Sequence, residues 1–246
     1  MGTSSAFVLD ANLGLTVGDA PWVGFLAAAG IVAEPSTDLV AIDGELARHD
    51  ADIGFVPAAD YHRFADDPAY RGLAIATSSR TGEPVQPAVL VVRVDDPATT
   101  TADLEGATLG YVNTSCSSSW FAPALLTHQR GRRVGEFFTP VLVPPWQPQI
   151  DAVVDGRTRA TTVLEDVWAA DPRNTTTTRI VDRVNGLAPP VVVARDTVDA
   201  DLAAAIVDQL LAWTPPPGAI YGPFVEWDPR FVEVFFAMLA SLPPDP

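Results

Sequence analysis

The sequence contains no lysine. Its positive charge comes from fifteen arginines, which face 31 aspartate and glutamate residues and leave a formal net charge of −16. Nucleic acids and anionic membrane surfaces are bound by clusters of basic residues, so this balance argues against both as partners. An anionic ligand would have to be held by local dipoles and individual arginines, because the overall field of the protein opposes it.

Cysteine and histidine are almost as scarce. The single Cys116 excludes an internal disulfide and a multi-cysteine metal site, and His49, His62 and His128 lack the spacing of metal ligands. We therefore expect no metal and no cofactor. No apolar run has the length of a membrane span, and the first five residues are uncharged, unlike the start of a signal peptide. The chain as it stands is expected in the cytoplasm, or outside it if an export signal was removed.

The remaining composition is that of a globular protein. Of the 246 residues, 48% are hydrophobic and 19% are charged, which is enough for one large domain or for two lobes with cores of their own. Short apolar runs alternate with amphipathic segments, which predicts an α/β fold with mostly parallel sheets. Residues 174–178 are expected to form an exposed loop. We expect strands over residues 6–9, 51–56, 73–77, 88–94, 107–112, 159–163, 179–184 and 190–194, and a strand and loop over 134–142. Helices are expected over 19–29, 44–49, 120–129, 149–154, 164–170, 199–213 and from Asp228 onward.

One polar stretch stands out, the run Asn113-Thr114-Ser115-Cys116-Ser117-Ser118-Ser119-Trp120 between a predicted strand and a predicted helix. Its hydroxyl and thiol side chains are poor core material, because each buried hydroxyl needs a hydrogen-bond partner. The first N–H groups of a helix have no internal acceptors, and the helix dipole places partial positive charge there. The stretch therefore favours an oxyanion site; the alternative is a serine-rich capped turn with no ligand.

Several segments together carry a family resemblance. They are Trp22 with Phe25-Leu26; Ala51-Asp52-Ile53-Gly54-Phe55-Val56-Pro57; Gly82-Glu83-Pro84 leading to residues 88–94 and Asp96-Pro97; Leu104-Glu105-Gly106-Ala107-Thr108-Leu109 leading to the serine-rich run and Pro123; and Val154-Asp155-Gly156-Arg157 followed by Ala160 and Glu165. Spread over most of the chain in this order, they resemble the phosphonate-, phosphate- and phosphite-binding proteins of ABC transporters, which have the type 2 periplasmic-binding fold.

This resemblance implies two α/β lobes, each a mostly parallel sheet flanked by helices. Lobe I would comprise residues 1–84 and 190–246, lobe II residues 85–189, and the ligand would be clamped between them. The implied function is a solute-binding protein, not an enzyme, that holds a small oxyanion such as a phosphonate or phosphate ester for transport or sensing, with an ABC transporter permease as partner. The alternative is a cytoplasmic enzyme on the same fold acting on a small carboxylate, because residues 52–61 also resemble the chorismate-using enzymes of the menaquinone pathway.

The resemblance also implies the binding residues. A Ser-Thr-Ser run holds the phosphonate oxygens in this family, and Cys116, Ser117 and Ser118 match it, with Ser115 beside them. Glu165 or its neighbour Asp166 matches one of two acids that bind the amine of aminophosphonates, but Pro189 replaces the other. The full expected ligand-binding set is Ser115, Cys116, Ser117, Ser118, Trp146, Arg159, Glu165, Val56 and Pro57.

Three of these residues depart from the family or have an alternative role. Arg159 stands where the family usually has aspartate, and it would either neutralise the ligand or pair with a carboxylate. Trp146 lies near a position that is histidine in some members. Cys116 could act as a nucleophile, but a histidine base is lacking nearby, which favours a plain binding-loop thiol. These departures argue against an aminoalkylphosphonate and favour an anion whose apolar or aromatic part stacks on Trp146 or Trp120.

Overall fold

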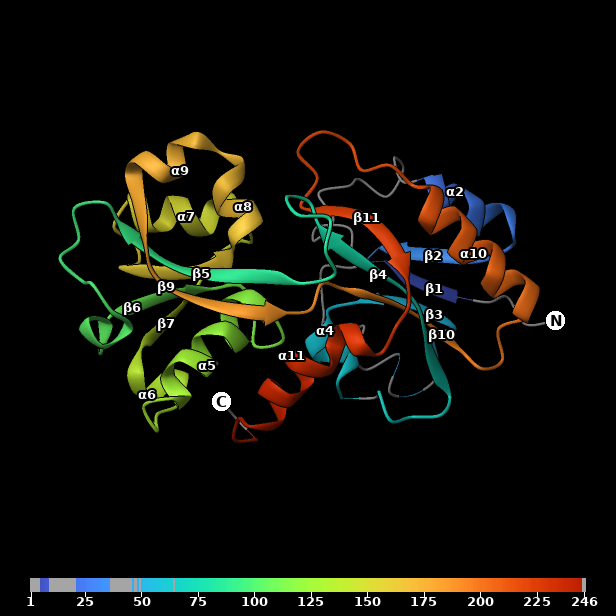
Figure 1. Cartoon of the computed structure of the whole chain (residues 1–246), viewed down its shortest axis with the longest axis horizontal. Helices are drawn as coiled ribbons and strands as arrows, with labels where there is room; N and C mark the ends of the chain where they lie inside the picture. Colours follow the sequence, from blue (N-terminus) through green and yellow to red (C-terminus); the bar gives the residue numbers. More distant parts are fainter. Residues whose placement is uncertain are drawn as a thin grey trace. The chain divides into compact units, whose positions relative to one another are not determined.

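The computed structural model describes residues 5–8, 21–35, 46, 48, 50–63 and 65–244. The chain divides into two compact units, each built around a sheet of its own (Figure 1). Unit 1 comprises Met1–Pro84 and Ala188–Val232, and unit 2 comprises Val85–Leu187 and Glu233–Pro246. The expected lobes share the first of these boundaries and differ from the units by a few residues at the second crossing and in the assignment of the last helix. The lobe assignment itself stays a prediction.

Unit 1 is built on a mixed sheet, sheet A, which has six strands among the described residues in the order β11-β4-β10-β3-β1-β2. Its first three strands along the chain run parallel, whereas β10 is antiparallel to both of its neighbours and β11 is antiparallel to β4. The strands are β1 (Ser5–Val8), β2 (Val32–Pro35), β3 (Ile53–Val56), β4 (Tyr70–Ser78), β10 (Val191–Arg195) and β11 (Tyr221–Glu226).

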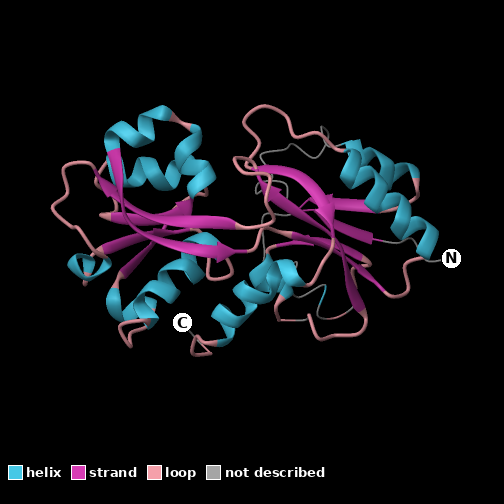
Figure 2. Cartoon of the chain, viewed as in Figure 1, coloured by secondary structure: helices cyan, strands magenta, loops and turns pink. Residues whose placement is uncertain are grey.

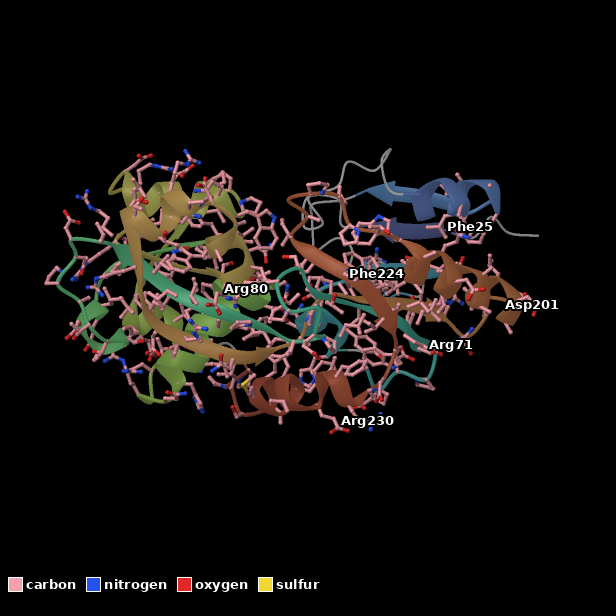
Figure 3. All side chains as sticks on the ribbon, turned by 45° about the horizontal axis from the view of Figure 1, so that its top comes forward. Phe25, Arg71, Arg80, Asp201, Phe224 and Arg230 are labelled. Carbon is pink, nitrogen blue, oxygen red and sulfur yellow. The ribbon has the colours of Figure 1, made fainter. Side chains whose placement is uncertain are left out.

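The helices α2 (Pro21–Ala28) and α10 (Ala200–Ala212) lie side by side on one face of sheet A (Figure 2). Asp199 begins α10 as predicted, because its Oδ1 accepts the N–H groups of Asp201 and Leu202. Phe224, labelled in Figure 3 on β11, has its ring 5.7 Å from that of Phe55 in an edge-on arrangement and 5.6 Å from that of Trp213, so strand and helix share one aromatic cluster.

Unit 2 is built on a second mixed sheet, sheet B, with the order β7-β6-β8-β5-β9. The strands β7, β6 and β8 run parallel, and β5 runs antiparallel to its neighbours β8 and β9. Buried valine, leucine and alanine side chains of these strands contribute to its core. The strands are β5 (Gln86–Arg93), β6 (Thr108–Tyr111), β7 (Thr139–Leu142), β8 (Ala160–Leu164) and β9 (Thr178–Leu187).

Helices cover both faces of sheet B (Figure 1). One face carries α7 (Gln147–Val154), α8 (Glu165–Ala170) and α9 (Pro172–Thr177), and the other carries α5 (Ala122–His128) and α6 (Val134–Phe137). The remaining elements are α4 (Ala58–Tyr61), the 3₁₀ turn η2 (Thr101–Leu104), the π-helical turn η3 (Ser117–Phe121), and α11 (Arg230–Ala240), which belongs to unit 1 up to Val232 and to unit 2 from Glu233.

The α/β class is confirmed, and both sheets are mixed: most strands of each sheet run in one direction, while β10 and β11 in sheet A and β5 in sheet B run against it. Parallel neighbours need a long crossover, usually through a helix. The strands β5 and β10 instead enter their sheets directly from the other unit, after the short connections 79–85 and 188–190. Each of them runs antiparallel to the strands on both sides of it.

Two local predictions are also corrected. The first half of the expected strand and loop over residues 134–142 is the helix α6, which begins where Glu136 Oε2 accepts the N–H of Arg133. The expected loop over residues 174–178 is instead the end of the helix α9 and the first residue of β9, and Thr175, Thr176 and Thr177 of the helix donate to backbone carbonyls. The predictions for Leu9, Asp19 and most of residues 44–49 lie outside the described residues.

Candidate functional site

The serine-rich run follows β6 at the edge of sheet B where its three parallel strands end. Tyr111 at the end of β6 is in register with Leu142 at the end of β7, and Gly110 is in register with Thr161 of β8. The segments that leave these strands therefore begin at the same edge. We call this the carboxyl edge: it carries residues 113–119 after β6, 143–146 after β7, and Glu165 with Asp166 after β8.

The helix after β6 begins earlier than predicted, at Ser117 instead of Trp120. Cys116 is extended, with φ −74° and ψ 120°, and is the residue that caps the helix. Its carbonyl oxygen accepts the N–H groups of Trp120 at 3.0 Å and Phe121 at 3.2 Å, the second of which is a π-helical bond. Its Sγ accepts the N–H of Ser119 at 3.5 Å. A π-turn that opens a helix is a feature often found at functional sites.

Two N–H groups remain at the start of this helix. Within the part of the chain that the structure describes, the N–H groups of Ser117 and Ser118 have no protein acceptor. Ser119, in contrast, is fully buried, and its Oγ accepts the N–H of Val112, which fastens the turn to the end of β6. The arrangement thus leaves two donors together with the Ser117 and Ser118 hydroxyls and the Cys116 thiol at the positive end of a helix.

The neighbouring polar residues shape the loop. Ser115 is buried, and its N–H donates to Oδ1 of Asn113 over 2.9 Å in a turn of the kind that asparagine favours. Sγ of Cys116 lies 3.5 Å from Oγ of Ser118. His128 ends α5, so the length of η3 and α5 separates it from Cys116 and it cannot act as a base on this thiol.

Trp146 and Glu165 lie at the carboxyl edge with the serine-rich run. Trp146 immediately precedes α7 and has φ 67° and ψ −120°, a conformation that side chains with a Cβ rarely adopt. Glu165 is the first residue of α8, and its Oε2 lies 2.6 Å from Nη1 of Arg183 in an ion pair. The structure therefore brings Ser115, Cys116, Ser117, Ser118, Trp146 and Glu165 to one edge of one sheet.

Arg159 is not part of this group. It precedes β8 at the opposite edge of sheet B, where its N–H donates to the carbonyl oxygen of Thr108 at the start of β6. Its guanidinium binds Asp96 with two hydrogen bonds, Nε to Oδ2 at 2.8 Å and Nη2 to Oδ1 at 3.1 Å. These bonds lower the pKa of Asp96 below its usual value. Of the two roles expected for Arg159, the geometry favours pairing with a carboxylate.

Val56 and Pro57 belong to unit 1. Val56 is the buried last residue of β3, and Pro57 caps α4, where its carbonyl oxygen accepts the N–H groups of Asp60 and Tyr61, both at 3.0 Å. The two residues therefore stand at the carboxyl end of a strand of sheet A, as the serine-rich run does in sheet B.

Two glutamines at the carboxyl edge are absent from the expected ligand-binding set. Gln86, at the start of β5, is buried and donates its side-chain N–H to Oδ2 of Asp166 at 3.3 Å. Gln149 is buried in α7 and accepts the N–H of Trp146 on its Oε1 at 3.1 Å. A glutamine near a helix start or within a strand has no distinctive local pattern, so only the fold reveals these roles.

The residues that the structure describes contain no cluster of three or more histidine, cysteine, aspartate or glutamate residues arranged to hold a metal ion. Among the same residues, no helix combines the length and the apolar character needed to cross a bilayer.

Comparison with known families gives a match over most of the chain. The family described as "ABC transporter, phosphonate, periplasmic substrate-binding protein" matches residues 28–219. No protein with a curated function matches the sequence closely.

Solved structures show the same fold. XAC2383 from Xanthomonas citri bound to ATP is 17% identical with a TM-score of 0.72, covering 97% of this chain and 96% of that one. The binding protein component of an ABC phosphonate transporter from Pseudomonas aeruginosa (PA3383) is 13% identical with a TM-score of 0.72, covering 97% and 86%. PhnD1 from Prochlorococcus marinus in complex with methylphosphonate is 12% identical with a TM-score of 0.72, covering 97% and 98%. These likenesses confirm the periplasmic-binding fold predicted from the sequence.

Proposed function

The chain belongs to the family of periplasmic substrate-binding proteins of phosphonate ABC transporters, and from this premise we propose that its serine-rich run binds the oxyanion head of a small phosphonate or phosphate ester. The protein is a solute-binding protein of the transporter type, as the resemblance in its sequence predicted. The comparisons give no support to the alternative, a cytoplasmic enzyme acting on a small carboxylate.

The observation that supports this ligand is the pair of N–H groups at Ser117 and Ser118. Both belong to the first turn of a helix, where the dipole favours negative charge, and neither has a protein acceptor among the described residues. Since the protein carries a net charge of −16, the anion has to be held by such local donors. We assign Cys116, Ser117 and Ser118 to the oxyanion, and Trp146 to the organic part of the ligand.

Two wider assignments remain part of the proposal. The partner is an ABC transporter permease, and the location is extracytoplasmic, as for the periplasmic proteins that the family comprises.

The test is isothermal titration calorimetry with methylphosphonate and phosphate on two variants at one position. Ser117→Pro removes both the N–H and the hydroxyl, yet proline suits the first position of a helix, and the extended Cys116 suits the residue before a proline. Ser117→Ala removes only the hydroxyl and is the matched control. We expect Ser117→Pro to weaken binding by about tenfold more than Ser117→Ala, because a hydrogen bond to a charged group is worth about 1.5–3 kcal/mol. Equal losses would contradict the backbone-amide site, and an absence of binding to any oxyanion would reject the proposed function.

A further inference from the structure

Trp146 has an unusual backbone. Among the described residues it is the one non-glycine residue with positive φ, at φ 67° and ψ −120°. A residue with a Cβ is destabilised in such a region, and it remains there only where its surroundings hold it. A tryptophan is also a poor choice for the residue that caps α7, because its indole offers no oxygen to the first N–H groups of the helix. Helix capping alone therefore does not account for a tryptophan here.

A buried side chain bonds to the backbone of Trp146. Gln149 is 1% exposed, and its Oε1 accepts the N–H of Trp146 at 3.1 Å. Its Nε2 donates to Oγ1 of Thr161 at 3.2 Å and to the carbonyl oxygen of Thr162 at 3.4 Å. Oγ1 of Thr161 in turn donates to the carbonyl oxygen of Gly110 at 2.8 Å. The amide thus connects the strained turn to β8 and, through Thr161, to β6.

These are the strands that hold the oxyanion segment in place. Gly110 directly precedes Tyr111, the last residue of β6, and the serine-rich run begins two residues later. Trp146 lies in the segment that follows β7. The strand β7 pairs in parallel with β6, and its last residue, Leu142, is opposite Tyr111 of β6. All of these residues belong to unit 2. One chain of hydrogen bonds therefore fixes Trp146 relative to the segment that is proposed to bind the anion.

We propose that Gln149 is a positioning residue that holds Trp146 against the organic substituent of the ligand, and that the site takes oxyanions with a flat, apolar substituent. This inference rests on the proposed function. The indole supplies a rigid apolar face for stacking, and the amide of Gln149 fixes where that face stands. Strained residues are characteristically found at binding sites, and the strain at Trp146 is then offset by its role in ligand recognition.

The experiment is calorimetric titration of the purified full chain with phenylphosphonate and methylphosphonate, compared as a ratio of affinities. The wild type should prefer phenylphosphonate, by about tenfold if the ring stacks on the indole. Gln149→Met keeps the length of the side chain and removes its hydrogen bonds, so it should reduce this ratio to about two while methylphosphonate affinity changes much less. Trp146→Phe should reduce the ratio to a similar extent, and the double variant should reduce it no further.

Gln147→Met is the matched control. Gln147 lies two residues away on α7, and its amide makes hydrogen bonds of the same kind, to Asp151 at 3.0 Å and to Asn174 at 2.9 Å. Removing the Gln147 amide should leave the ratio of phenylphosphonate to methylphosphonate affinity unchanged. Equal losses of both ligands in Gln149→Met would mean a merely structural role and would overturn the inference. If the wild type binds methylphosphonate but does not prefer phenylphosphonate, this inference is overturned and the proposed function stands. If the wild type binds neither compound, both the proposed function and the inference are overturned.

Discussion

Oε2 of Glu165 lies 2.6 Å from Nη1 of Arg183, and this ion pair draws the carboxylate onto the face of sheet B that α7 covers. Arg183 is in register with Val89, which is in register with Val163. Val163 shares its face with Thr161, to which Gln149 of α7 donates a hydrogen bond. Glu165 is 5% exposed, so its charge is met by a protein cation inside unit 2.

The first prediction concerns the strength of this pair. Arg183→Gln leaves a buried carboxylate without its cation and should lower the free energy of unfolding by about 1–2 kcal/mol, less than for a fully buried pair because the Arg183 side chain is 40% exposed. Arg93→Gln, which breaks the exposed pair with Asp95, should lower the free energy of unfolding clearly less, because water screens that pair. Urea unfolding followed by circular dichroism measures both. Equal effects would show that Glu165 does not depend on Arg183.

The second prediction concerns the ligand's charge and follows from the same pair. A ligand ammonium group gains the most binding free energy from a carboxylate that is not already paired with a protein cation, and Glu165 is already paired with Arg183. We therefore expect ethylphosphonate to bind about tenfold more tightly than 2-aminoethylphosphonate, because the ammonium loses its hydration without compensation. Calorimetric titration of the wild type with both compounds measures this ratio. Tighter binding of the aminoethyl compound would show that another carboxylate receives the amine.

Much of the fold could be predicted from the sequence because its signals are local. The helix α10 extends over Ala200–Ala212, close to its predicted range, and its apolar stripe and the cap at Asp199 lie within a few residues of each other. The strands β5 and β8 were predicted from short apolar runs of the right length. Strand direction could not be predicted in this way, since it depends on which distant segments become neighbours.

The site was predictable in part for the same reason. The start of a helix at the serine-rich run is visible in the sequence, although the π-turn moves its first residue to Ser117. The pairing of Arg159 with Asp96 joins residues that are 63 positions apart, and no local pattern records it. Gln149 carries no local sign of its role either, because three of its contacts lie on β8 and on the segment before α7.

The third prediction compares two glycines. A Cβ on Gly222 would stand 2.5 Å from Oγ1 of Thr77 and 2.7 Å from the backbone oxygen of Ser78, and the backbone cannot move aside cheaply. Gly222→Ala should therefore lower the free energy of unfolding by about 1–3 kcal/mol. At Gly24 in α2 an added Cβ would have no atom within 4 Å. Gly24→Ala should therefore raise the free energy of unfolding by about 0.5–1 kcal/mol, since alanine favours a helix. Thermal unfolding of both variants measures these changes in stability. A loss of stability of similar size in the two variants would contradict the steric explanation.

The fourth prediction concerns pH. Hydrogen bonds from the N–H groups and hydroxyls of Thr99 and Thr100 lower the pKa of Asp103 to about 2. A carboxyl whose folded pKa is depressed stabilises the fold above its unfolded pKa, and this contribution is lost as the pH falls through the folded value. The stability difference between wild type and Asp103→Asn should thus be largest near neutral pH and clearly smaller at about pH 2.5. Urea midpoints over this range test it, with Asp208→Asn on the exposed side of α10 as control.

The fifth prediction concerns the strain at Trp146. Trp146→Ala and Trp146→Gly both remove the indole, but only glycine adopts φ 67° and ψ −120° without cost. The glycine variant should therefore be more stable than the alanine variant by about 1–2 kcal/mol, the reverse of the usual order in folded chains. Urea unfolding of the two variants measures the difference directly, because their lost side-chain contacts are nearly the same. If alanine proved the more stable, the backbone at Trp146 would be relaxed in solution, and Gln149 would have no strained conformation to hold.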